Sequence, residues 1–157
     1  MSSINHNHEL HDRDFYAWAK QTSQLLREGK INEVDVMNIA EELEDMTISL
    51  THALKSYLTL LITHLLKCKY QPERFGSSWE ITIKKARINI QDLLSDKPSL
   101  KSQLKVKFEV AYKNARLEAA DETGLNESAF PKECPFTPEE CFDESFWPVE
   151  VINKSIG

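Results

Sequence analysis

The residues best suited to chemistry lie at one junction of the chain, between His64 and Trp79. The segment 64–72 combines a histidine, two lysines, a cysteine, a tyrosine and an amide with apolar residues, and Trp79 follows shortly afterwards. His64 shares a helical face with Leu61 and Cys68, so its ring should be buried or half-buried and should need a hydrogen-bond partner. Such a histidine is either a structural core group or a titrating or ligating group, and the sequence leaves both open.

Helical counting brings two carboxylates to the same junction. Glu118 and Glu122 lie four positions apart on a later helix, which should end at the same end of the bundle. A pocket there would suit a cationic or hydrogen-bonding ligand, or a divalent metal if an imidazole met both carboxylates. The alternative is a structural ion-pair network in which Lys67 or Arg87 binds these acids. The expected lining residues of this candidate polar pocket are His64, Trp79, Arg87, Glu118 and Glu122.

A second acidic segment, 41–45, holds four carboxylates, but they do not converge. At ~100° per residue, Leu43 and Met46 should point to the core, and only Glu42 lies at the edge of that stripe. Glu42 would also be ~33 Å from His64 along a straight helix, too far for an acid–base dyad. We therefore expect a solvated face with one carboxylate at its edge.

No metal site or cofactor is expected. His64 and Cys68 have a workable ligand spacing, but Cys134 and Cys141 lack the tight spacing of a zinc knuckle. There is no Glu-x-x-His pair, phosphate-binding loop or nucleophile elbow. Residues 1–11 contain three histidines that could form a metal-binding tract, although we expect this segment to be a disordered tail.

The elements that must position these residues are helices, because apolar residues recur at helical spacing almost throughout. The sequence predicts helices between Asp12 and Gly29, between Asn32 and Pro72, between Ser77 and Lys97, and between Lys97 and Gly124. The second is unusually long, and a break within 47–51 is possible because its hydroxyl side chains can compete for backbone hydrogen bonds.

These elements predict an all-α fold: an antiparallel bundle of about four main helices with one long central helix. A C-terminal strap rich in proline and aromatic residues should lie across it, with a short helix introduced by the capping box Thr137-Pro138-Glu139-Glu140. A peptide-like ligand segment is the alternative for this strap. We expect one helical domain over 12–148 and a C-terminal tail over 149–157.

The third and fourth helices each carry a second apolar line opposite the first. Either the long helix or the C-terminal segment covers these lines, or they form a dimer surface. The residues concerned are Ile81, Ile88, Val106, Val110 and Leu117.

Charge, apolar runs and cysteine content restrict the partners and the cellular location that we expect. A net charge of -6 disfavours binding along a nucleic-acid backbone. The apolar runs are too short for a membrane span. Three cysteines cannot all pair within one chain, and no secretory leader opens the sequence, so we expect a cytoplasmic protein.

A set of motifs gives the chain a family resemblance. The segments that carry it are 14–18, 25–30, 40–46, 64–67, 70–73, 78–79, 98–100 and 122–125. Through these segments, from Asp12 to Pro148, the chain resembles the bacterial family catalogued as domain of unknown function number 29. The resemblance implies an almost wholly helical protein with no described activity, and it includes Glu41, Glu42, His64, Trp79 and Arg87 among its recurring residues.

These observations favour a non-enzymatic helical-bundle protein that acts through protein contacts, with a homodimer as one form. The alternative is a small-ligand or metal-binding protein, or an enzyme, with its site at the bundle end near His64 and Trp79.

Overall fold

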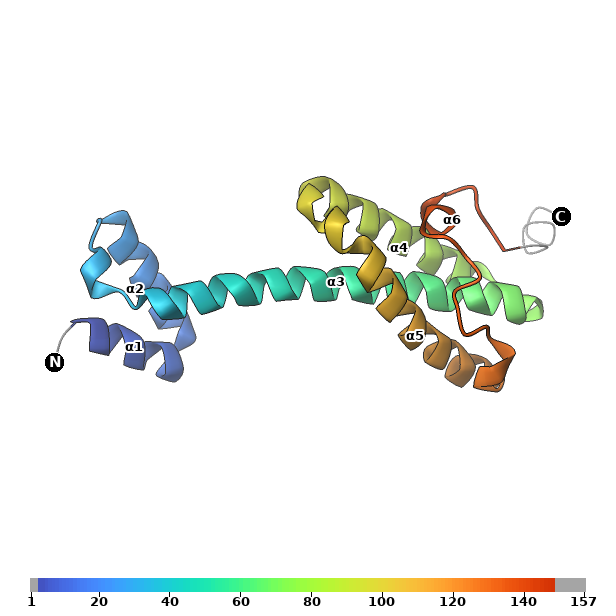
Figure 1. The fold of residues 1–157 in the computed structure, drawn as a ribbon, viewed down its shortest axis with the longest axis horizontal. Helices are drawn as coiled ribbons and strands as arrows, with labels where there is room; N and C mark the ends of the chain where they lie inside the picture. Colours follow the sequence, from blue (N-terminus) through green and yellow to red (C-terminus); the bar gives the residue numbers. More distant parts are fainter. Residues whose placement is uncertain (1–2, 149–157) are drawn as a thin grey trace. The chain divides into compact units, whose positions relative to one another are not determined.

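The computed structural model describes residues 3–148, and within them the chain is helical without a β-strand (Figure 1). The all-α prediction, with a long central helix, is confirmed. The α-helices are α1 (Ser3–Arg13), α2 (Phe15–Arg27), α3 (Val36–Tyr70), α4 (Ser77–Asp96), α5 (Leu104–Thr123) and α6 (Pro138–Phe142). Short 3₁₀ helices join them: η1 (Ile31–Glu33), η2 (Pro72–Arg74), η3 (Pro98–Gln103) and η4 (Glu127–Ala129).

The chain divides into two compact units, Met1–Ser49 and Leu50–Gly157, which we call the N-terminal unit and the C-terminal unit. The boundary falls inside α3, so the first turns of this helix belong to the N-terminal unit and the later turns to the C-terminal unit. The expectation of a single domain over 12–148 stays a prediction.

The N-terminal unit contains α1, which the sequence analysis missed. A disordered tail over 1–11 is wrong for Ser3 onward, because this segment is helical and the Asn7 side chain is fully buried. The segment was hard to recognise because α1 is held by polar side chains rather than by an apolar stripe. The next helix, α2, begins at the N-cap Asp14, whose carboxylate accepts from the backbone N–H of Ala17 at 3.1 Å.

The long helix α3 has 35 residues and no break. Its first turn is capped by Asp35, not Asn32, because the Asp35 carboxylate accepts from the amides of Met37 and Asn38. Thr47 donates to the carbonyl of Glu44 and is accommodated within the helix.

Two core assignments on the first half of α3 are wrong. Leu43 and Met46 are exposed rather than buried. On this part of α3 Asn38 is buried and Glu42 is half-buried, and both contact histidines of α1. An apolar stripe shows which residues share a face of a helix, but it does not show along which part of that helix other helices pack.

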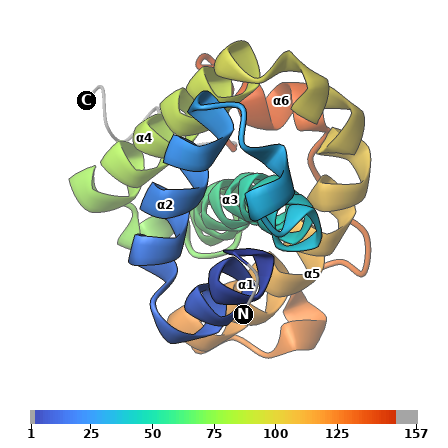
Figure 2. The ribbon, with the colours of Figure 1, turned by 90° about the vertical axis from the view of Figure 1, so that its left-hand side faces the viewer.

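The C-terminal unit packs α4 and α5 against the second half of α3. In Figure 1, α4 returns antiparallel to α3 and α5 reverses again; Figure 2 shows α4 and α5 on different sides of α3. The core is one apolar cluster whose fully buried members on α3 are Leu54, Leu58, Leu61, Ile62, Leu65, Leu66 and Cys68.

The turn between α4 and α5 begins at Pro98, where the sequence predicted a helix start. It forms the 3₁₀ helix η3, with Leu100 buried, and α5 begins only at Leu104. At its other end α5 stops at Gly124, whose φ of 75° is the left-handed conformation that glycine favours. Gln71 donates to the carbonyl of Thr123 at 3.1 Å, so the ends of α3 and α5 lie together.

The strap, residues 125–148, closes the C-terminal unit. Phe130, Phe136 and Cys141 are buried in the core cluster, and the capping box at the start of α6 forms as the sequence predicted. Tyr112 donates to the carbonyl of Pro131, which ties the strap to α5. The expected tail over 149–157 lies outside the described residues.

Candidate functional site

The candidate polar pocket at the end of α3 is built around Lys67 rather than His64. Lys67 is buried, and its ammonium donates to Glu122 at 2.7 Å. The same ammonium lies 4.5 Å from the centre of the Trp79 ring, close enough for a cation–π interaction. One turn earlier, Thr63 donates to the carboxylate of Glu118 at 3.4 Å.

His64 is half-buried beside this cluster, with its ring engaged by its own helix. Its Nδ1 lies 3.0 Å from the carbonyl oxygen of Leu60, and because a carbonyl can only accept, Nδ1 carries the proton. Burial lowers the pKa of His64 and outweighs the hydrogen bond to the Leu60 carbonyl, which acts to raise it; the charge of Lys67 also lowers the pKa, while Glu122 and Glu118 oppose that effect. His64 is therefore a neutral ring with Nδ1 occupied.

Arg87 does not bond with these acids. It is buried on α4, and its guanidinium binds the strap by donating to the carbonyls of Cys141 at 2.8 Å, Glu144 at 3.5 Å and Phe146 at 2.7 Å. Its charged end also lies 5.3 Å from the Trp147 ring centre. The expected set of pocket residues is thus divided: His64, Trp79, Glu118 and Glu122 lie around Lys67, whereas Arg87 holds the strap.

A surface depression of about 370 Å³ lies beside Arg87, between α4, η3 and the strap. Among its lining residues are Gln91, Ser95, Lys101 and Glu144. Of the residues predicted to line a pocket, Arg87 is the one that borders this space.

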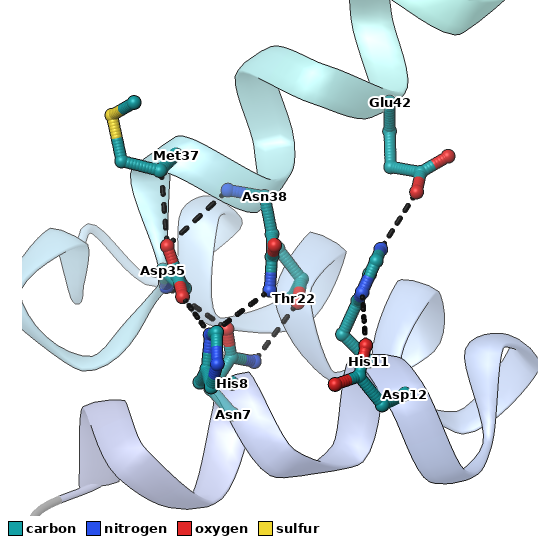
Figure 3. A network of polar contacts seen from close by, with 9 residues as sticks. All are labelled: Asn7, His8, His11, Asp12, Thr22, Asp35, Met37, Asn38 and Glu42. Atoms are coloured by element: carbon teal, nitrogen blue, oxygen red, sulfur yellow. Dashed lines mark hydrogen bonds and ion pairs between the residues drawn. The ribbon is translucent and has the colours of Figure 1, made fainter.

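A second polar cluster, which the sequence analysis missed, joins α1 to α3 in the N-terminal unit (Figure 3). His8 donates through Nδ1 to Asp35 at 2.6 Å, and His11 donates through Nε2 to Glu42 at 2.6 Å. Asn7 completes the cluster, because its amide donates to Thr22 and its carbonyl accepts from the backbone N–H of Asp35.

His11 sits between two carboxylates. Its Nδ1 lies 3.3 Å from Asp12 while its Nε2 bonds with Glu42, so both contacts are satisfied only when both ring nitrogens carry protons. The hydrogen bond to Glu42 raises the pKa of His11, more than burial lowers it. The ring also packs edge-on against Trp18, with 4.6 Å between ring centres.

Asp35 has the matching role at the start of α3. Burial acts to raise its pKa, but the hydrogen bonds from His8 and from the amides of Asn38 and Met37 lower it overall. One carboxylate thus caps α3 and anchors α1. The sequence signal was that each pair recurs near a whole number of helical turns and so shares one face: His8 and His11 are three apart, and Asp35 and Glu42 are seven apart.

Metal ligands do not assemble in either cluster. Over residues 3–148, no three His, Cys, Asp or Glu side chains gather closely enough to hold a metal ion. Burial raises the pKa of the Cys68 thiol to about 12 and that of Cys134 to about 11, so both are protonated at neutral pH. None of the helices in this part of the chain combines the length and apolarity that a bilayer crossing requires.

The fold and the polar clusters together define a class of protein: an all-helical protein in which buried charged side chains connect the helices to one another and to the strap. The chain belongs to the family described as Domain of unknown function DUF29, which it matches over residues 10–147. No curated protein and no solved structure is significantly similar to it. The match includes His11, Asp35 and Glu42, so most of the missed cluster lies within the family domain.

Proposed function

We propose that this protein acts through protein–protein contacts made by the outer faces of α4 and α5, first of all with a second copy of itself, and that it catalyses no reaction. One observation carries the proposal: each helix exposes apolar side chains on the face that points away from α3. The five residues concerned are between 38% and 57% exposed; they are Ile81, Ile88, Val106, Val110 and Leu117.

The inner faces of the same helices are already used. On α4, Ile83 and Ile90 are buried in the core, and on α5, Phe108 and Ala115 are buried there. A surface helix that packs only against its own core is expected to be polar on its outer side. A helix that is apolar on both sides is suited to pack against the core on one side and against another protein on the other.

The polar side chains predicted to form a pocket make contacts that are typical of structural groups. Lys67 is bound to Glu122 beneath the Trp79 ring, and Arg87 is bound to three strap carbonyls. Buried charges that are paired in this way hold elements together. Contact surfaces, rather than these groups, are therefore the better candidates for function.

Light scattering after size exclusion tests the proposal. Wild-type protein should show a mass above the 18.1 kDa of one chain as concentration rises. Replacing Ile88, Val106 and Leu117 together by Ser should return it to the monomer mass with an unchanged helical circular-dichroism spectrum. A control with the exposed residues Lys85, Asp92 and Lys97 replaced by Ser should resemble wild type. A wild-type monomer at every concentration would overturn the proposal.

The rival function is a small-ligand or metal-dependent activity near His64 and Trp79. It is favoured by the grouping of a neutral imidazole, an ammonium and two carboxylates at one end of the bundle. Metal analysis of the purified protein separates the two functions. Metal that is retained by wild type and lost from both His64→Ala and Glu122→Ala would support the rival, whereas metal-free samples would leave the contact proposal in place.

A further inference from the structure

We infer that the partner of α5 is α5 of a second copy, packed antiparallel about a twofold axis level with Ala111 and Tyr112. This inference rests on the proposed function and adds the element, direction and register of the contact.

The outer face of α5 carries a longer apolar line than that of α4. Val106, Val110 and Leu117 follow each other at intervals of four and seven positions, which places them on one stripe opposite the buried face. On α4 the line has Ile81 and Ile88, and α4 lies on a different side of α3 from α5 (Figure 2). The two lines do not form one patch, and that of α5 is the longer.

Apolar matching selects a register for an antiparallel pair. If Val106 lies opposite Leu117 of the second copy, the same contact recurs on the other side of the axis, and Val110 lies next to the axis. A twofold contact is self-complementary, so one α5 surface provides both halves of the interface.

The charges beside the stripe fit the same register. Lys107 and Glu118 lie on one flank of α5, while Glu109 and Lys113 lie on the other. About a twofold axis each flank meets the same flank of the second copy, so Lys107 faces Glu118 and Glu109 faces Lys113. In a parallel pair the opposite flanks would meet, so Glu109 would face Lys107 and Lys113 would face Glu118 of the second copy. Exchanging the charges at 109 and 113 would then create like-charge contacts, whereas an antiparallel pair tolerates the exchange.

Other charges near this face are already engaged. Arg116 donates to the strap carbonyl of Phe130 and to the carboxylate of Glu127, both at 3.1 Å. Glu118 accepts from Thr63 at 3.4 Å but remains exposed. Because α5 has 20 residues, it is about 30 Å long, so one helix pair gives a small interface and a dimer that forms at high concentration.

Charge reversal tests the register by sedimentation at several protein concentrations. Glu109→Lys and Lys113→Glu should each weaken the dimer roughly tenfold, since each repulsion occurs twice. The double variant exchanges the two charges and should restore wild-type affinity. Asp92→Lys on α4 changes the net charge by the same amount as Glu109→Lys and should leave the dimer unchanged.

Cysteine cross-linking provides an independent test. Under oxidation, a mixture of Val106→Cys and Leu117→Cys proteins should form a disulfide-linked dimer, while either variant alone should not. Cross-linking of each variant with itself would indicate a parallel pair and overturn the inference. A dimer that is disrupted by Ile88→Glu but unaffected by the α5 charge reversals would also overturn it, yet leave the proposed function standing. A monomeric wild type would end both.

Discussion

At the scale of residues, two histidines on neighbouring helices have opposite electrostatic environments. His11 lies between the carboxylates of Glu42 and Asp12, and its pKa is raised. His64 is buried beside the ammonium of Lys67, and its pKa is lowered. The same type of side chain therefore has a raised pKa where it links α1 to α3 and a lowered pKa in the other unit, because the partners of a histidine set its pKa.

The His11 contact should make the N-terminal unit sensitive to pH. The folded pKa lies above the unfolded value of 6.5, so the stabilisation is complete below pH 6.5 and is lost as pH rises through the raised pKa. A protonated imidazole quenches tryptophan, so Trp18 fluorescence, measured in a Trp79→Phe/Trp147→Phe background, reports the titration. We expect a midpoint above 6.5 in wild type.

Matched variants identify the cause of that midpoint. Glu42→Gln removes the carboxylate that bonds with His11 and should lower the midpoint. Glu41→Gln removes an exposed neighbouring charge and should leave it nearly unchanged. Equal midpoints in wild type and Glu42→Gln would show that Glu42 does not hold the proton on His11.

Arg87 should be the most sensitive charged residue of the C-terminal unit. Arg87→Met leaves three strap carbonyls without their donor, and we expect a loss of about 3 kcal/mol in the free energy of unfolding by urea. Arg87→Lys should lose most of the same amount, because an ammonium cannot span three acceptors as a guanidinium does. Lys84→Met, an exposed neighbour on α4, should cost at most about 0.5 kcal/mol. A fully stable Arg87→Lys would contradict this account.

At the scale of elements, the ends of the helices are set by local chemistry. Asp14 and Thr137 cap α2 and α6 with their own side-chain oxygens, and Gly124 ends α5. The signals at Thr137 and Gly124 are readable in the sequence because each depends on residues within one turn, whereas the sequence placed the start of α2 at Asp12 rather than Asp14. The start of α3 could not be predicted from neighbouring residues alone, because Asp35 also binds His8 from α1.

Two glycines allow a controlled test of helix termination. Gly124 has a φ of 75°, whereas Gly76 is extended with a φ of -158°, and an added Cβ would meet nothing within 4 Å at either site. Gly124→Ala should lower the free energy of unfolding by about 1 kcal/mol through backbone strain. Gly76→Ala should change it by less than about 0.5 kcal/mol. Equal effects in thermal or urea unfolding would argue against strain at Gly124.

At the scale of the whole molecule, each of the two units is stabilised by a different kind of interior. The C-terminal unit has a continuous apolar core. In the N-terminal unit the buried residues include the polar Asn7, Thr22 and Asn38 as well as Trp18 and Val34. A polar interior of this kind is stable only while its hydrogen bonds are complete.

Hydrogen exchange should show whether the units open separately. Leu61→Ala removes a fully buried side chain of the C-terminal unit and should cost about 3 kcal/mol there, reducing protection of amides in α4 and α5. Protection in α1 and α2 should be retained. Asn7→Ala should do the reverse, since its amide binds only within the N-terminal unit. Parallel loss of protection in both units would mean that they unfold as one.

The sequence alone determined the helical class, the presence of one long central helix, the glycine stops and the capping box of α6. It also identified the second apolar lines on α4 and α5, because helical periodicity is a local property of the chain, but it left their exposure open. Counting along helices further placed Glu122 at the same end of the bundle as His64.

Only the tertiary structure decided which polar groups meet. Arg87 binds strap carbonyls that follow it by more than fifty residues, and Lys67, rather than His64, binds Glu122. α1 forms because the side chains of His8, His11 and Asn7 find partners on α2 and α3. Hydrogen bonds between distant residues leave no periodic pattern in the sequence, so their partners become known only once the helices are packed.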